Sequence, residues 1–309
     1  MPRRAIAIGL ILVAAIAFVV RTVLHARAGR VPEIMWGKRG VMPGDVVRPR
    51  AATVDLNGDI YLVDFTARIQ RYHPDGTYAG VTWQTPDFRN GRPSGLSTDR
   101  DGNILVCDSH YHCVRTYSPD GQLLRTMGGN AGTGAGQFGY VSDCIQDADG
   151  FYYLAEFGQN DRITKLDSEG RFVCTWGTSG LEPGQFQRVR SLAIGPDDLI
   201  YVADACNHRI QVFTKAGEFV RTFGQAGEKA GEFSYPYDLC FNAKGELYVV
   251  ERGNMRVQKL TKEGLPLGSW GGPGAGKGQF ADPWALVVDK NGKVQVVDTE
   301  NHRVQRIDF

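Results

Sequence analysis

The sequence predicts an all-β protein, a six-bladed β-propeller built from four-stranded antiparallel blades. A pattern of apolar strand, acidic residue, polar loop and basic strand recurs six times, and its acids are spaced by 44, 48, 48, 47 and 47 residues. Glycine turns separate the strands, and the chain of 309 residues contains 39 glycines. Four short strands in a unit of about 47 residues are typical of one propeller blade.

Each unit shows four strands in the same order. An apolar strand leads into a turn such as DLNGD or DRDGN, and the second strand ends at the recurrent acid. The third strand begins with a basic residue in five of the six units, and a second turn such as PDG or KEG introduces the fourth strand. Glycine suits these turns because it adopts positive φ at no steric cost. The recurrent acids are Asp64, Asp108, Glu156, Asp204, Glu251 and Asp298.

The sixth unit stops after its third strand, and a matching strand occurs at the other end of the chain. Residues 31–40 (VPEIMWGKRG) have the same form as residues 266–274 (PLGSWGGPG). We expect Ile34–Trp36 to pair with Val304–Ile307 and to close the ring as the fourth strand of the last blade, because an open ring leaves two unpaired edges. The propeller is then expected to occupy residues 31–309 and to be monomeric.

Residues 1–30 are a separate segment. A basic start is followed by an uninterrupted apolar run from Ala5 to Val20. This pattern is typical of a signal peptide or of an uncleaved signal anchor, which would form a hydrophobic helix before the propeller. Both alternatives place the propeller outside the cytoplasm, secreted or attached to the membrane, and in the periplasm if the source is bacterial.

The charge distribution argues against a nucleic-acid partner. The first 30 residues carry five arginines and no acid, whereas the rest of the chain has 30 Lys and Arg against 34 Asp and Glu, a net charge of −4. Binding to a phosphate backbone requires a basic surface. We therefore expect no nucleic-acid binding, although a local basic patch is compatible with these totals.

The sequence strings that recur in the six units resemble a known family. GQF, DACNHRIQVF and GEFVRTFG in the fourth unit, and TENHRVQRI in the sixth, are similar to the NHL repeat. The resemblance extends over residues 31–309 and implies a six-bladed propeller. Similar propellers serve as extracytoplasmic sensor domains and as interaction platforms.

The stretch DSHYHC at residues 108–113 suggests either a metal site or repeat structure. In the register of the repeat, His112 takes the position of His208 and His302, which predicts a local hydrogen bond or packing between blades. Cys113 takes the position of the basic residue that we expect to bridge to the loop acid, so the second unit is expected to lack that bridge. No metal ligand and no cofactor are predicted; zinc or calcium is the alternative.

The candidate binding site follows from the propeller geometry. The first strand of each blade lines the central channel, so the residues at its start should form the channel mouth. The predicted ligand-binding residues are Arg50, Ser94, Asp143, Arg190, Tyr237, Asp238, Trp284 and the loop residue His110. The alternative is that these residues plug the channel and hydrogen-bond to one another.

Two functions are compatible with this site. The first is a non-catalytic binding or scaffold propeller that recognises a peptide, glycan or protein partner at the channel mouth. The second is a metal-dependent lyase or hydrolase similar to the amidating-lyase propellers, in which histidines of a P-H-S motif hold zinc. In this sequence the motif's shape persists in RPSGLS (92–97), with Ser94 in place of the histidine, and no catalytic residue is predicted.

Overall fold

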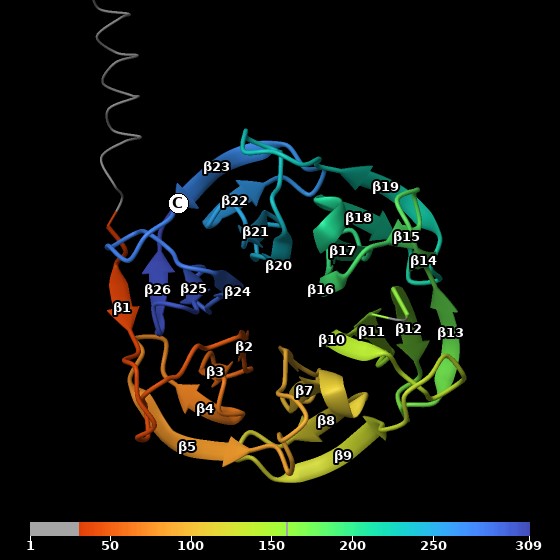
Figure 1. The fold of residues 1–309 in the computed structure, drawn as a ribbon, viewed down its shortest axis with the longest axis horizontal. Helices are drawn as coiled ribbons and strands as arrows, with labels where there is room; N and C mark the ends of the chain where they lie inside the picture. The colour runs from red at the N-terminus through yellow and green to blue at the C-terminus, as the bar shows by residue number, and fades with distance from the viewer. Residues whose placement is uncertain (1–30, 159) are drawn as a thin grey trace, which may run out of the picture.

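The computed structural model describes residues 31–309 except residue 159. Six four-stranded antiparallel sheets form a ring around a central axis (Figure 1), which confirms the all-β six-bladed propeller. The predicted signal peptide or anchor, residues 1–30, lies outside the described residues. Among residues 31–309, no helix is both long and apolar enough to span a bilayer.

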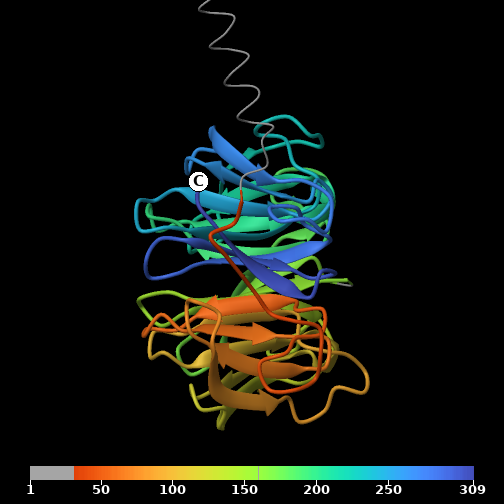
Figure 2. The same ribbon diagram turned by 90° about the vertical axis from the view of Figure 1, so that its left-hand side faces the viewer.

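In five blades the strands run from the axis outward in chain order, and in the last blade β1 lies outside β26 (Figure 1). Figure 2 shows the ring from the side. The innermost strands are β2 (Ala51–Val54), β6 (Gly95–Thr98), β10 (Tyr140–Gln146), β16 (Val189–Ile194), β20 (Pro236–Phe241) and β24 (Pro283–Val288). The second strands are β3 (Ile60–Val63), β7 (Ile104–Asp108), β11 (Tyr152–Phe157), β17 (Ile200–Asp204), β21 (Leu247–Glu251) and β25 (Val294–Asp298).

The outer half of each blade follows the same order. The third strands are β4 (Arg68–Tyr72), β8 (Cys113–Tyr117), β12 (Arg162–Leu166), β18 (Arg209–Phe213), β22 (Arg256–Leu260) and β26 (Arg303–Ile307). The outermost strands are β5 (Tyr78–Gln84), β9 (Leu123–Gly128), β13 (Phe172–Trp176), β19 (Phe219–Phe223), β23 (Pro266–Gly271) and β1 (Ile34–Trp36). The remaining elements are the parallel pair β14 (Thr178–Ser179) and β15 (Gln185–Phe186) and the short 3₁₀ turns η1 (Ser109–Tyr111) and η2 (Ala205–Asn207).

The last blade contains both ends of the described chain. β1 pairs antiparallel with β26, with Met35 opposite Gln305 and Trp36 opposite Val304. Both views show residues near the C-terminus beside the start of the propeller (Figures 1 and 2). The pairing gives this blade the same four-strand composition as the other five.

The apolar core lies between the blades. Each of six clusters of buried side chains combines residues from two consecutive blades, and one of them joins the last blade to the first. The repeated GQF and GEF connectors supply fully buried aromatic rings to four of these clusters. Gly177 shows why glycine precedes such a connector: its φ is +91°, and a Cβ would lie 2.3 Å from the Phe186 ring. These connector rings are Phe138, Phe186, Phe233 and Phe280.

The recurrent acids tie each blade to its connector. In five blades the arginine that begins the third strand pairs with the acid at 2.5–3.0 Å, which confirms the predicted bridges. The same guanidinium donates to connector carbonyls; Arg209, for example, donates to Leu181 and Gln185. The guanidinium groups of these arginines therefore hydrogen-bond within the propeller and stabilise its fold.

The prediction that the second blade lacks such a bridge is wrong. Arg115 lies two residues beyond Cys113, and its Nε is 3.2 Å from Asp108 Oδ2. Alternate residues of a strand face the same side, so Arg115 reaches the acid from the Cys113 side. Arg115 takes over only part of the usual arginine's role, because among the described residues the buried Asp108 Oδ1 has no hydrogen-bond partner.

The histidine positions of the repeat serve contacts between blades. His302 has φ of +54°, and its Nδ1 accepts the backbone N–H of Arg48 in the next blade at 2.9 Å. His208 accepts from Tyr235 N–H in the same way, and Asp161 of the third blade accepts the N–H of Arg188 at the start of the fourth. The predicted local role is thus confirmed for the blades in which a histidine or an aspartate occupies this position.

The hydrogen bond from the Arg48 N–H to His302 Nδ1 makes the free energy of unfolding depend on pH. Burial lowers the pKa of His302 below its usual value of 6.5, so its contribution is present above about pH 6.5 and is lost as the pH falls through the folded-state pKa. Asparagine keeps an acceptor and tolerates left-handed φ. Between pH 7.5 and 5, His302→Asn should therefore lose less unfolding free energy in urea titrations than the wild type. Equal losses would contradict this role.

Candidate ligand-binding channel

The six innermost strands enclose a cavity of about 150 Å³ on the propeller axis. All six blades contribute, from Ala51 and Gly95 to Ala285. The structure brings seven of the eight predicted residues to the walls of this cavity, with His110 as the exception. The seven are Arg50, Ser94, Asp143, Arg190, Tyr237, Asp238 and Trp284.

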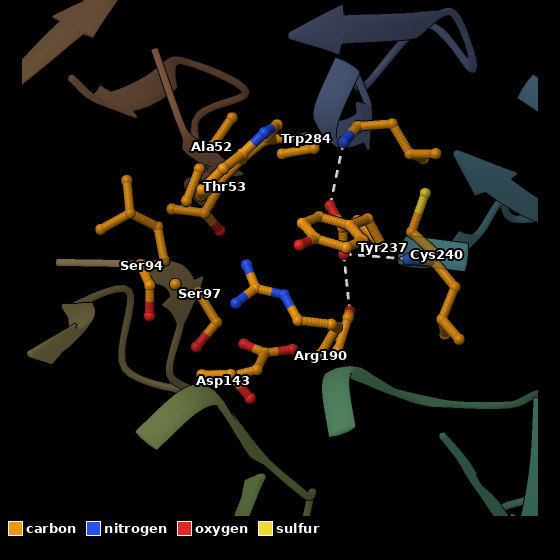
Figure 3. Close-up of a pocket in the computed structure, with 18 of the residues that line it drawn as sticks. Ala52, Thr53, Ser94, Ser97, Asp143, Arg190, Tyr237, Cys240 and Trp284 are labelled. Carbon is orange, nitrogen blue, oxygen red and sulfur yellow. Dashed lines mark hydrogen bonds between the residues drawn. The ribbon is translucent and has the colours of Figure 1, made fainter. Parts of the chain in front are cut away.

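Arg190 is the central side chain of the cavity. Figure 3 shows it extending from β16 into the middle of the pocket, with Tyr237 beside it. The residue is only 6% exposed, yet no hydrogen bond or ion pair joins its side chain to another described residue, and its buried Nε has no partner. Burial lowers the pKa of the guanidinium, because the charged form loses its hydration.

Aromatic rings surround this cation. The guanidinium carbon of Arg190 lies 4.5 Å from the Tyr237 ring centroid, 5.4 Å from that of Trp284 and 5.9 Å from that of Phe157. Such contacts each contribute about 0.5–2 kcal/mol, depending on desolvation. They offset part of the cost of burying Arg190, but among the described residues no acceptor pairs with its buried Nε.

The same pairing of arginine and aromatic ring continues around the mouth. Phe65 lies 4.0 Å from the Arg92 guanidinium carbon and 5.0 Å from that of Arg48. Arg50 lies 4.5 Å from the Trp284 centroid, so it and Arg190 both contact one indole ring. We call this set the arginine–aromatic collar. It comprises Arg48, Arg50, Arg92, Arg188, Arg190 and Arg252 with Phe65, Phe157, Tyr237 and Trp284.

Only two collar arginines have an acidic partner. Arg48 pairs with Glu300, and Arg252 pairs with Asp282. Among the described residues, the side chains of the other four make no ion pair or hydrogen bond. These four are Arg50, Arg92, Arg188 and Arg190. The mouth is therefore a concentrated positive site on a propeller whose overall charge is negative.

The crowding of like charges is clearest at Arg50. Burial, together with the neighbouring Arg190, Arg92 and Arg48, lowers the pKa of Arg50 from 12.5 to about 10. The guanidinium is still protonated at neutral pH, but the protein holds it at an energetic cost. An anion placed between these cations would remove part of that cost.

The two predicted aspartates have a structural task. Asp143 accepts the backbone N–H of Leu192 in the next blade at 2.9 Å, and Asp238 accepts that of Leu286 in the same way. Burial and the charge of Asp238 raise the pKa of Asp143 to about 7. These carboxyls therefore join blades, and they neutralise Arg190 incompletely.

Ser94 is also engaged within the fold. Its hydroxyl bonds to the Ser109 hydroxyl and lies 3.3 Å from the Val141 carbonyl of the third blade. The alternative that predicted residues hydrogen-bond within the protein therefore holds for Ser94 and the two aspartates, and also for Tyr237 and Trp284. It does not hold for Arg50 and Arg190.

Tyr237 and Trp284 are fixed by a polar network. Arg252 donates to the Tyr237 hydroxyl at 3.3 Å, and the Trp284 indole N–H donates to Asp282 at 3.1 Å. Asp282 itself adopts left-handed φ of +53°. Left-handed non-glycine residues cost of order 1–3 kcal/mol and cluster at functional sites. Arg48, Arg188 and Tyr235 adopt the same left-handed conformation. They stand two residues before Arg50, Arg190 and Tyr237, as Asp282 stands before Trp284.

His110 lies on the rim. It is exposed, in η1, and its ring is 5.2 Å from that of Tyr140. Burial of part of the ring and the nearby Arg50 lower its pKa below 6.5. It is not among the residues that line the cavity. Among residues 31–309, with residue 159 set aside, no group of three His, Cys, Asp or Glu side chains is placed to hold a metal ion.

Sequence reasoning missed Arg48, Arg92, Arg188 and Arg252. A signal for two of them exists in the register, since Arg48 and Arg188 each stand two residues before a predicted arginine. Arg252 follows a recurrent acid and could have been found by the same alignment. The sequence does not show which of these arginines lack an acidic partner.

The fold and the recurrent acid–arginine pairs define a propeller with NHL-type blades, and comparison with known proteins supports this class. The NHL repeat family model matches residues 90–117, 186–213, 233–260 and 280–307, which lie in blades two, four, five and six. The chain is therefore a six-bladed β-propeller that carries NHL repeats in these four blades.

Several characterised proteins share part of this sequence or fold. Peptidylglycine alpha-amidating monooxygenase of Rattus norvegicus is 36% identical over 131 residues, covering 38% of this chain and 13% of the relative. NHL repeat-containing protein 3 of Mus musculus is 27% identical over 173 residues, about half of each chain. Virginiamycin B lyase of Staphylococcus aureus has a similar fold, with a TM-score of 0.59 at 18% identity over 84% of this chain and 79% of the lyase.

Proposed function

We propose that this propeller is a binding module that recognises a peptide, glycan or protein partner at the arginine–aromatic collar. The observation that carries the proposal is the set of collar arginines without an acidic partner among residues 31–309, residue 159 aside, above all Arg190, whose buried Nε has no hydrogen-bond partner there. A buried charge without a partner is destabilising. Rigid aromatic rings and arginines are also the side chains that dominate binding energy at recognition surfaces.

The proposed setting is outside the cytoplasm. Residues 1–30 would export the propeller or attach it to a membrane, and in a bacterium the propeller would work in the periplasm. Fractionation of cells expressing the C-terminally tagged chain tests this setting. Recovery of the protein only in the cytosolic fraction would contradict it.

Binding can be tested on peptide and glycan arrays with the purified propeller. Trp284→Ala should remove the ligands that bind the wild type, because Trp284 contacts both Arg50 and Arg190. Phe172→Ala is the matched control, since Phe172 is an exposed aromatic residue on the outermost strand β13. Binding that survives Trp284→Ala unchanged would place the recognition surface elsewhere.

A second candidate is a lyase or hydrolase acting at the same face. Similarity to an amidating monooxygenase and to a virginiamycin B lyase favours it. An enzyme of the amidating type would carry zinc, or calcium, but the described residues provide no cluster to which we can assign such an ion. Metal analysis of the wild type, Arg190→Ala and His110→Ala separates the candidates. Stoichiometric metal in the wild type that is lost in one of these variants would favour the enzyme.

A further inference from the structure

We infer that the collar binds a terminal oxyanion, a carboxylate or phosphate group, between the guanidinium groups of Arg50 and Arg190. This inference rests on the proposed function and names the chemical group that the ligand must carry. It follows from the number of unused donors, the closeness of the cations and the narrowness of the cavity.

The first argument is the unused hydrogen-bonding capacity. A guanidinium carries five N–H donors, and carboxylate and phosphate are the groups that match its fork. The arginines that begin the third strands, such as Arg209, use these donors on a loop acid and on connector carbonyls. Arg190 and Arg50 use none of theirs on described residues.

The second argument is electrostatic. Arg50 and Arg190 lie 4.5 and 5.4 Å from the same Trp284 centroid, and Arg92 approaches from the Phe65 side. The nearest carboxyls, Asp143 and Asp238, already accept backbone N–H groups of neighbouring blades. An oxyanion would supply the missing negative charge, whereas a neutral or cationic ligand would leave the repulsion between the arginines unrelieved.

The third argument is size. The cavity of about 150 Å³ admits a small terminal group but not a folded partner or a base-paired nucleic acid. A chain end with a carboxylate, an acidic sugar or a phosphate monoester fits this limit. The rest of the ligand would lie on the exposed rim around His110 and the collar aromatics.

Inorganic phosphate and acetate test the inference directly, by isothermal titration and thermal unfolding of the wild type at pH 7 and constant ionic strength. Both anions should bind more tightly than chloride and raise the unfolding temperature. N-acetylglycine against N-acetylglycinamide, and glucuronate against glucose, identify the source of the group. In each pair only the anionic member should bind.

Arg190→Met is the decisive variant. It should weaken phosphate or acetate binding about tenfold to a hundredfold, because charge-assisted hydrogen bonds are lost. The unliganded variant should unfold at the same temperature as the wild type or higher, because methionine removes an unpaired buried charge while keeping the packing. A merely structural arginine would instead lower the unfolding temperature when replaced. Arg100→Met is the matched control. Arg100 is exposed, forms no ion pair with any described residue and lies in the turn at the far end of β6 from Ser94.

Three outcomes would overturn the inference: no preference for oxyanions over chloride, equal weakening by Arg100→Met, or binding of a single-stranded RNA that Arg190→Met removes. The failure of the inference is distinguishable from the failure of the proposed function. If Trp284→Ala abolishes array binding but phosphate and acetate do not bind, the collar is a recognition site for uncharged ligands. If neither experiment gives binding, the proposed function itself fails.

Discussion

Replacing Trp36 with alanine is expected to lower the free energy of unfolding by about 3–5 kcal/mol. Trp36 is in β1, 7% exposed, and its ring centroid lies 4.7 Å from that of Tyr72 in the first blade. Its indole N–H donates to Gln295 of the last blade at 3.2 Å. One side chain thus joins the first and last blades, and its loss leaves a cavity at the seam of the ring.

Met35→Ala is the control for this prediction. Met35 is the neighbouring residue of the same strand but is 37% exposed, so its replacement should cost less than about 1 kcal/mol. Urea unfolding at pH 7, followed by tryptophan-independent far-ultraviolet circular dichroism, measures both. If Trp36→Ala lost as little unfolding free energy as is expected for Met35→Ala, β1 would not be a structural part of the last blade.

Asp298→Asn is expected to cost about 2–4 kcal/mol, although the two side chains have nearly the same shape. The carboxylate is fully buried and accepts from the Ala281 N–H, Arg303 and Gln305. An amide can accept fewer of these bonds and cannot neutralise Arg303. The pair is therefore broken while the arginine stays in place.

The second blade supplies the matched control, Asp108→Asn. Asp108 has one weak partner, Arg115, and its Oδ1 has none. Burial raises the pKa of Asp108 to about 6, against the opposing effect of Arg115. Because the folded state disfavours this charge, the substitution should change the unfolding free energy at pH 7 by less than about 1 kcal/mol. A loss as large as that of Asp298→Asn would refute the assignment of the weak bridge.

The repeat made most of the fold predictable. The recurrent acid marks the end of the second strand in every blade, and in five blades the basic residue that pairs with it marks the start of the third strand. The start of each inner strand was likewise predictable as cavity lining, which is where Arg190 and Tyr237 lie. Aligning the six repeat units was enough to find these positions, because every blade repeats the same geometry around a common axis.

What the sequence could not show is which polar groups have partners. Arg115 replaces the bridge missing at Cys113 because it shares a face of β8, a relation hidden in the alignment of equivalent positions. Asp143 and Arg190 were both predicted to bind a ligand. Asp143 accepts a backbone N–H of the next blade, whereas the buried Nε of Arg190 has no partner among the described residues. The net charge of −4 for residues 31–309 also concealed the positive mouth, because a sum over the chain carries no position.

The most direct test of a collar that holds an anion is to locate one there. Crystals grown with 4-bromobenzoate, measured at the bromine absorption edge, report the position of the ligand by anomalous scattering. Our account predicts a bromine peak at the channel mouth, with the carboxylate directed toward Arg50 and Arg190. A ligand that binds in solution but gives its peak on the outer strands or on the opposite face would contradict the account.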